Sequence, residues 1–340
     1  MNICESCFGD KELKGFINSE GKVDVCTFCK SNINNVISLN EILDFFQELL
    51  NCFETKADGK SLAGLIQGQW DLFSSNRIAS DVLNAVISKL NTAFYNAEVQ
   101  VDYSQEIHSN VNYWKELKEQ LKWERRYLSD VDYLTHELGW DGFFQSQSVI
   151  NEDDILYRGR LHQNTDDECF NMNSMSCPPK HVSTAGRANP MGIPYLYLSD
   201  NEDTVLYEIR ATYLDDVTVA KFSIKPDLNK KVLISDFTEI PTLYHPGEVD
   251  KRIKASLLKE RISLDLSQPV RRYDSELDYI PTQFICEFIR LYTDVDGIKF
   301  RSSLNNTGIN YVIFDQSIMT CTEVSKIQVS KVEISHRPID

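Results

Sequence analysis

Apolar residues recur at helical spacing in three segments of the N-terminal part of the chain. One helix is expected to begin at the capping-box sequence SLNE, residues 38–41, and to continue through apolar positions up to Phe53. A second is expected over residues 80–97 and a third over 111–136. Four large side chains of the third helix are expected to face the core: Trp114, Leu117, Leu121 and Tyr127. The pattern predicts a helical domain over residues 36–145.

After the polar and acidic stretch 145–154, which we expect to be a linker, short β-rich runs alternate with short helices. Strands are expected in the runs ILYRGRL, PYLYLS, VTVAKFSI, KVLISD, NYVIF and IQVSKVEIS. Helices are expected over residues 202–210, 247–259 and 281–292. Because strands and helices do not alternate in regular βαβ units, an α+β fold is favoured over a doubly wound sheet. The second domain is expected to cover residues 150–340.

The charge balance restricts the classes of partner. The chain of 340 residues carries 35 Lys and Arg against 51 Asp and Glu, a formal net charge of −16. This charge repels phosphate backbones and anionic lipids, so nucleic acid and membranes are not expected as partners. No apolar run approaches the about 20 residues of a transmembrane helix, and the first residues lack the features of a secretory signal. We therefore expect a cytoplasmic protein.

Four of the nine cysteines form two C-x-x-C pairs, Cys4 with Cys7 and Cys26 with Cys29. Two such pairs at this separation are typical of a tetrahedral four-thiolate zinc site. Because all four positions are filled, we expect a structural Zn²⁺ rather than a catalytic one. We expect a zinc ribbon over residues 1–35, in which the stretch between the pairs forms a small hairpin or ribbon.

Several motifs of nucleotide binding and catalysis are absent. The sequence contains no P-loop, no strand-linked G-x-G-x-x-G, no H-E-x-x-H and no G-x-S-x-G. In the helical domain, no histidine follows Arg125 and Arg126 within two helical turns. A ribonuclease site made of an arginine and a histidine on one helix face is therefore not expected there.

In the second half, four segments combine turn residues with polar groups that have no evident packing role. They are LYRGR (156–160), GRANPMG (186–192), TVLYE (204–208) and DGIKFRS (296–302). Their order and local context resemble the RES-domain family, which is named for an Arg, a Glu and a Ser. The resemblance spans more than half of the chain, over about residues 150–325.

The three residues of the family name match Arg158, Glu208 and Ser302. The resemblance implies a fold like that of ADP-ribosyltransferases and an enzyme that degrades NAD⁺ by hydrolysis or phosphorolysis. The nicotinamide of NAD⁺ leaves without needing a proton, so one carboxylate suffices, and we assign Glu208 to stabilise the oxocarbenium-like transition state. Arg158 is expected to bind the pyrophosphate, because the N–H donors of its planar guanidinium group form a fork that matches phosphate oxygens. Ser302 can fix the ribose or the carboxylate.

Three further residues are expected to bind the substrate. Arg187, on the GR turn of the family, can assist at the pyrophosphate, and Tyr197, on its LY pair, can stack on a base. Asn189 and the glycines of the same turn would let the backbone approach the ligand closely. Arg160 remains an alternative to Arg158 as the phosphate ligand.

The resemblance also bears on biology. Small RES proteins are toxins held by an antitoxin, whereas the front half of this chain resembles zinc and helical domains that are joined to RES domains and compared with HEPN proteins. We expect a toxin or antiphage defence effector that depletes NAD⁺, with a protein partner or self-association as means of control. Two alternatives stay open: ADP-ribosyl transfer to a macromolecule, and a zinc-ribbon binding module with an inert nucleotide-binding RES domain. Whether water, phosphate or a macromolecule accepts the ribosyl group is also open.

Overall fold

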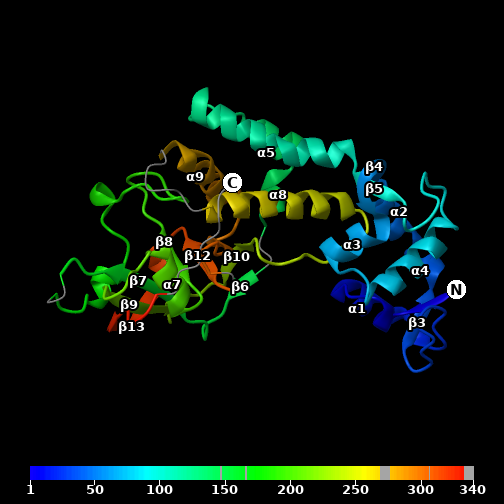
Figure 1. The fold of residues 1–340 in the computed structure, drawn as a ribbon, viewed down its shortest axis with the longest axis horizontal. Coiled ribbons are helices and arrows are strands. Elements are labelled where there is room, and N and C mark those ends of the chain that lie inside the picture. The colour runs from blue at the N-terminus through cyan, green and yellow to red at the C-terminus, as the bar shows by residue number, and fades with distance from the viewer. Residues whose placement is uncertain (146–147, 165–166, 269–275, 306, 333–340) are drawn as a thin grey trace. The chain divides into compact units, whose positions relative to one another are not determined.

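The structure is a computed structural model that describes residues 1–145, 148–164, 167–268, 276–305 and 307–332 (Figure 1). Its internal contacts divide the chain into two compact units. Unit 1 comprises Met1–Lys115 and Glu239–Leu258, and unit 2 comprises Glu116–Thr238 and Lys259–Asp340. The segment Glu239–Leu258, which we expected inside the second domain, thus groups with unit 1. The expected boundaries of the ribbon, the helical domain and the RES domain stay predictions.

Unit 1 begins with a three-stranded antiparallel sheet in the order β1-β3-β2, formed by Asn2–Cys4, Asn35–Ser38 and Lys22–Val23. The prediction of a small hairpin or ribbon between the two cysteine pairs is wrong, because most of that stretch is helix α1 (Lys11–Glu20). Asp10 favours this helix by accepting hydrogen bonds from the backbone N–H groups of Glu12 and Leu13, both at 3.0 Å. Leu13 and Ile17, four residues apart, bury one face of it.

The other helices of unit 1 only partly match the hydrophobic pattern. The capping box of Ser38 and Glu41 is present, and a short 3-10 turn (Leu39–Ile42) leads from it into α2 (Leu43–Asn51). The second helix lies earlier than expected, as α4 (Asn76–Ile87). The pattern missed α3 (Leu62–Trp70) and the antiparallel pair of β4 (Phe53–Ser61) and β5 (Gln100–Tyr103).

Two long helices, α5 (Gln105–Trp123) and α8 (Val249–Ser267), cross the boundary between the units. Helix α5 ends well before the expected residue 136, because Arg126 folds back and donates hydrogen bonds to the carbonyl oxygens of Leu121 at 3.2 Å and Lys122 at 3.3 Å. Trp114, Leu117 and Leu121 are buried as expected, but Tyr127 lies beyond the helix and is 96% exposed.

Unit 2 is built on an eight-stranded mixed sheet in the order β13-β9-β7-β8-β12-β11-β10-β6 (Figure 1). All neighbouring strands are antiparallel except β10 and β11. The strands are β6 (Ser148–Ile150), β7 (Leu156–Leu161), β8 (Leu196–Ser199), β9 (Asp216–Ile224), β10 (Val232–Asp236), β11 (Gly297–Arg301), β12 (Ile309–Ile313) and β13 (Met319–Gln328). This mixed α/β arrangement agrees with the expected class.

Two details of the strands differ from the sequence pattern. Strand β6 lies inside the stretch that we expected to be a linker, and it pairs with β10 at the edge of the sheet. The last expected strand, residues 327–335, begins earlier and ends at Gln328, and residues 333–335 lie outside the described residues.

The main helices of unit 2 are α6 (Trp140–Phe143), α7 (Glu202–Glu208) and α9 (Ile280–Tyr292). Helix α7 packs on β7 (Figure 1). This packing requires glycine at position 159, since a β-carbon there would lie 2.5 Å from a methyl group of Val205. Other short helical segments are Glu5–Cys7 in unit 1 and, in unit 2, Tyr133–Glu137, Met172–Met175, Lys180–Val182, Glu276–Tyr279 and Gln316–Ile318. In the part of the chain that the structure describes, no helix is long and apolar enough to cross a bilayer.

Asp10 also fastens the segment before α8 to the N-terminal module of unit 1. Its second carboxylate oxygen accepts hydrogen bonds from the backbone N–H groups of Leu243 at 2.6 Å and Tyr244 at 3.3 Å. The ring of Tyr244 contacts Phe16 and Phe45, with ring centroids 5.2 and 5.1 Å apart. One buried carboxylate therefore accepts four backbone hydrogen bonds from two distant parts of the sequence.

Replacement of Asp10 by Ala should destabilise unit 1 by about 2–4 kcal/mol, because the cap of α1 and two buried N–H groups lose their acceptor together. Urea unfolding followed by circular dichroism measures this loss. Asp81→Ala, at an exposed position on α4, is the matched control and should change the free energy of unfolding by less than about 0.5 kcal/mol. Equal stability of the two variants would contradict the role of Asp10.

Candidate functional site

A pocket of about 640 Å³ in unit 2 gathers most of the residues that the sequence singled out. Arg158, Arg187, Tyr197 and Glu208 line it. Much of the remaining wall is apolar or aromatic: Tyr157, Leu198, Val205, Ile209, Leu266, Tyr279 and Phe300. Such a volume and lining are typical of a site for a small molecule or cofactor.

One row of residues across four strands forms a wall of this pocket. Ser199 on β8 lies opposite Asn310 on β12 and opposite Tyr157 on β7, and Asn310 lies opposite Phe300 on β11. Directly paired residues of neighbouring antiparallel strands share one face of the sheet. All four residues line the pocket. The positions of these side chains are therefore set by strand register rather than by a loop.

Glu208 is the last residue of α7, and its carboxylate is half-buried beside this row. Its oxygen Oε1 accepts two hydrogen bonds, one from Ser302 Oγ and one from Asn310 Nδ2, both at 2.7 Å. Hydrogen bonds to an ionised group are stronger than those between neutral groups. The structure thus brings two of the three residues of the Arg, Glu and Ser set into direct contact.

Ser302 acts on this carboxylate with a defined orientation. Its hydroxyl oxygen accepts hydrogen bonds from the backbone N–H groups of Leu304 at 3.2 Å and Asn305 at 3.1 Å. Because the lone pairs are used in this way, the hydroxyl hydrogen is directed to Glu208. Ser302 is only 6% exposed and is not among the residues that line the pocket, so its contact is with the carboxylate.

Arg158 lines the pocket from β7, and its guanidinium is largely buried. Among the described residues, its Nη1 is sealed from solvent and has no hydrogen-bond partner. Burial lowers the pKa of Arg158, an effect that the neighbouring Cys177 opposes and the charge of Arg160 reinforces. Arg160 does not line the pocket and donates a hydrogen bond to the carbonyl oxygen of Ser176 at 2.8 Å. The geometry therefore favours Arg158 over Arg160 as the group available to a ligand.

The turn that follows Gly186 is fastened by Tyr197. The phenol donates a hydrogen bond to Asn189 Oδ1 at 2.8 Å and accepts one from the backbone N–H of Ala188 at 3.0 Å. Burial raises the pKa of Tyr197 above its ordinary value. A β-carbon at Gly186 would lie 2.7 Å from the phenol oxygen, so this turn needs glycine.

Asn189 and Arg187 play different parts in this turn. The side chain of Asn189 is 4% exposed and also donates to the carbonyl oxygens of Thr184 and Pro190, so its polar atoms hold the turn and do not reach the pocket. Arg187 does line the pocket, and its Nη1 donates to the carbonyl oxygen of Leu266 at 2.8 Å.

Asn310 and Ser199 also belong to the site, although the sequence motifs assign no role to them. Asn310 contacts Glu208 directly, and Ser199 Oγ donates to Asn310 Oδ1 at 2.8 Å. The signal that could have found them is the presence of polar residues at the ends of two strongly apolar runs, PYLYLS and NYVIF. A buried amide among apolar neighbours needs hydrogen-bond partners and therefore calls for a nearby charge or polar group.

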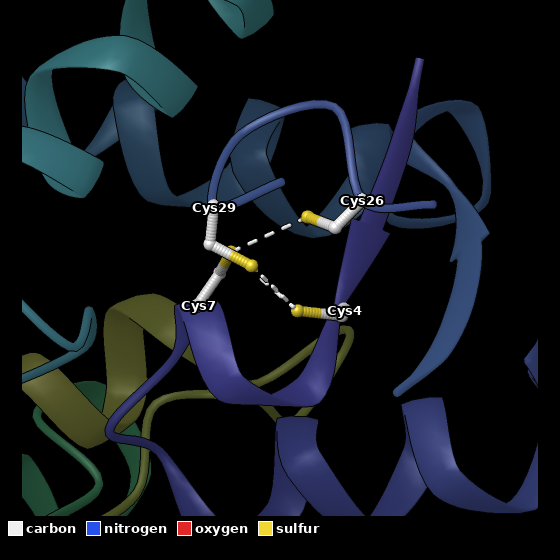
Figure 2. Close-up of side chains that lie close together, drawn as sticks. All are labelled: Cys4, Cys7, Cys26 and Cys29. Atoms are coloured by element: carbon white, nitrogen blue, oxygen red, sulfur yellow. Dashed lines mark hydrogen bonds between the residues drawn. The ribbon is translucent and has the colours of Figure 1, made fainter. Parts of the chain in front are cut away.

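In unit 1, the four paired cysteines converge at one point (Figure 2). The Sγ atoms are separated by 3.7 Å between Cys4 and Cys7, 3.4 Å between Cys4 and Cys29, and 3.6 Å between Cys7 and Cys26. A tetrahedral ion with sulfur ligands at about 2.3 Å sets its ligands about 3.8 Å apart. The four thiols lie within 4.8 Å of one another and so are close enough to hold a metal ion.

The electrostatics of this cluster also suit a cation. Burial raises the pKa of the Cys7 thiol, and the charges of Cys26 and Cys4 raise it further. Burial also acts to raise the pKa of Cys26, but backbone N–H groups, above all that of Cys29, bring it down to about 7. A bound cation would offset the repulsion among the thiolates.

Comparison with known proteins bears on unit 2. No curated protein and no solved structure matches the chain. The family model of the RES domain matches residues 156–334, just over half of the 340-residue chain, and this range contains the whole pocket with Arg158, Glu208 and Ser302. The chain therefore belongs to the RES-domain family.

Proposed function

We propose that this protein is an NAD⁺-consuming enzyme that releases nicotinamide, with an ADP-ribosyltransferase-like fold in its RES domain. The observation that carries the proposal is the Glu208 carboxylate on the wall of a pocket of about 640 Å³, held by Ser302 and Asn310. The RES family is associated with enzymes that use NAD⁺, and the pocket volume suits a cofactor-sized ligand.

The chemistry needs one carboxylate at the ribose. Nicotinamide leaves as a neutral molecule, since the ring of NAD⁺ is already cationic, and positive charge develops on the ribose as the glycosidic bond breaks. Glu208 stabilises that charge and accepts a hydrogen bond from a ribose hydroxyl. Tyr197 presents its ring to the pocket as a surface for a base while its hydroxyl holds the 186–189 turn.

Arg158 supplies the cation for the pyrophosphate. Its guanidinium lines the pocket and is largely buried, which supports a role in holding an anion. Arg187 adds a second positive charge on the same pocket.

In cells, we propose that the protein depletes NAD⁺ as a toxin or antiphage defence effector. Unit 1 carries a structural Zn²⁺ at Cys4, Cys7, Cys26 and Cys29 and serves in control, through a protein partner or self-association. The experiment that tests the function is release of nicotinamide from NAD⁺ by the purified protein, with and without phosphate. Phosphate dependence indicates phosphorolysis, and label from [³²P]NAD⁺ on protein or RNA would instead indicate ADP-ribosyl transfer.

Replacement of Glu208 by Gln should keep NAD⁺ binding but lower kcat by about 10²-fold or more, because the amide retains the shape and loses the charge that stabilises the transition state. Steady-state nicotinamide release and calorimetric NAD⁺ binding measure the two effects. Glu202→Gln, at the exposed first turn of α7, is the control and should keep kcat. Near-normal turnover of Glu208→Gln would remove this carboxylate from the mechanism.

Replacement of Arg158 by Gln should weaken NAD⁺ binding by about 10- to 100-fold, the loss expected for a charged hydrogen bond. Arg160→Gln, two residues along the same strand, should leave the Kd within about 3-fold, because Arg160 is engaged by Ser176 outside the pocket. Both substitutions are made in the Glu208→Gln protein and titrated with NAD⁺ by calorimetry, so that NAD⁺ is not turned over during the measurement. The reverse order of the two effects would assign the phosphate to Arg160.

The wild-type chain should contain one Zn²⁺, and Cys26→Ser should lose it and destabilise unit 1, because the thiolate is a ligand that the hydroxyl cannot replace. Metal analysis by mass spectrometry and thermal unfolding check both effects. Cys169→Ser, at an exposed cysteine outside the cluster, should keep the metal. Full zinc content in Cys26→Ser would show that the ligand assignment is wrong.

A further inference from the structure

We propose that Asn310, oriented by Ser199, is a positioning residue that holds one oxygen of Glu208 and leaves the other free for the substrate. This inference rests on the proposed function and deepens it, since it assigns separate tasks to the two oxygens of a single carboxylate. Its first element is an asymmetry at Glu208, whose hydrogen bonds from Ser302 and Asn310 both end on Oε1.

The second oxygen, Oε2, is in a different position. Among the residues that the structure describes, it has no hydrogen-bond partner, and it is not sealed from solvent. Glu208 lines the pocket, so Oε2 is the carboxylate oxygen available to a ligand there. A ribose hydroxyl or a developing positive charge would therefore meet an oxygen that has no competing donor.

The chemistry of the neighbours fixes which end of the Asn310 amide faces Glu208. An ionised carboxylate only accepts hydrogen bonds, so the NH₂ end of the amide must point to it. The carbonyl end then faces Ser199, whose hydroxyl donates to Oδ1 at 2.8 Å. Without this donor, the buried amide carbonyl would lose its partner, and the orientation of the amide would be less firmly held.

The backbone makes the arrangement stiff. Asn310 and Ser199 are directly paired across β12 and β8, in the interior of the eight-stranded sheet, and they are 8% and 4% exposed. Ser302 approaches the same oxygen from the turn after β11, with its hydroxyl oriented by two backbone N–H groups. Two donors from separate parts of unit 2 therefore define the rotamer of Glu208 before any substrate binds. Preorganisation of this kind lowers the barrier because no reorientation is needed during the reaction.

Asn310→Ala should lower kcat for nicotinamide release about 10-fold or more with little change in KM, and Ser199→Ala should lower it in the same way but less. Asn310→Asp gives a sharper test. Its carboxyl group must be protonated to donate to Oε1, and two adjacent carboxylates resist sharing one site as anions. The kcat of Asn310→Asp should therefore be highest at low pH and fall as the pair loses its proton, unlike that of the wild type.

Thr218→Val is the matched control for a lost buried hydroxyl in the same sheet. Thr218 is fully buried on β9, accepts a hydrogen bond from the N–H of Phe170 at 3.1 Å and is not among the residues around Glu208. The Thr218→Val variant should be less stable than the wild type but should keep its kcat and its pH profile. Unchanged kcat and pH profile in Asn310→Ala and Asn310→Asp, beside an active wild type that Glu208→Gln inactivates, would overturn the positioning role and leave the proposed function standing.

Crystal structures of the wild type and Asn310→Ala test the same inference without turnover. The Glu208 carboxylate should move or occupy more than one rotamer in the variant while β12 keeps its place. An unmoved carboxylate would overturn the positioning role. A wild type that releases no nicotinamide, together with a displaced Glu208 in Asn310→Ala, would overturn the proposed function and support the positioning.

Discussion

When a carboxylate is partly removed from water, hydrogen bonds from the protein must replace its lost hydration. The packing of α7 against the sheet of unit 2 allows Glu208 to meet this requirement. The donors come from Ser302 and from Asn310. They reach the carboxylate only because α7 lies close to the sheet, which in turn needs the absence of a side chain at Gly159. A similar close approach occurs at Gly308, where a β-carbon would lie 2.2 Å from the hydroxyl of Thr204 on the same helix. Two glycines on the sheet side thus set the distance between helix and strands.

The pocket places unlike surfaces side by side. Among its charged groups, Arg158 and Arg187 come from β7 and from the 186–192 turn, Glu208 comes from α7, and Arg210 and Glu276 also line it. Aromatic and aliphatic side chains line much of the rest of the pocket, among them Tyr157 and Phe300. A ligand that carries an anionic centre, a cationic ring and a second flat ring matches this combination of charged and aromatic groups. NAD⁺ has these features, and its cationic end is the one that would meet a carboxylate.

The sequence was informative where a local pattern corresponds to local chemistry. The C-x-x-C spacing predicted that four thiols would converge, and the capping box of Ser38 and Glu41 is present. The ordered motifs also pointed to Arg158, Glu208 and Ser302, although their contacts depend on the fold. The helix between the cysteine pairs was missed, because the C-x-x-C spacing carries no information on Asp10, which caps α1. Asn310 and Ser199 were missed because strand register brings them together, and a single sequence does not state register.

A single sequence also does not state which distant segments contact each other, and for this reason the division of the chain into two units was not predicted. The segment Glu239–Leu258 lies inside the range that the RES family matches, yet it belongs to unit 1. Hydropathy along the chain does not reveal this grouping, because the residues that hold the segment are distant from it in the sequence. The Asp10 carboxylate accepts hydrogen bonds from the backbone N–H groups of Leu243 and Tyr244. The Glu48 carboxylate accepts hydrogen bonds from the backbone N–H of Gly247 at 2.8 and 2.9 Å. A fragment that begins at residue 150 would keep this segment but lose the groups that satisfy it, including the aromatic neighbours of Tyr244. The two units are interleaved in sequence, so the RES domain of this protein is best understood as part of the full chain rather than as a separable C-terminal half.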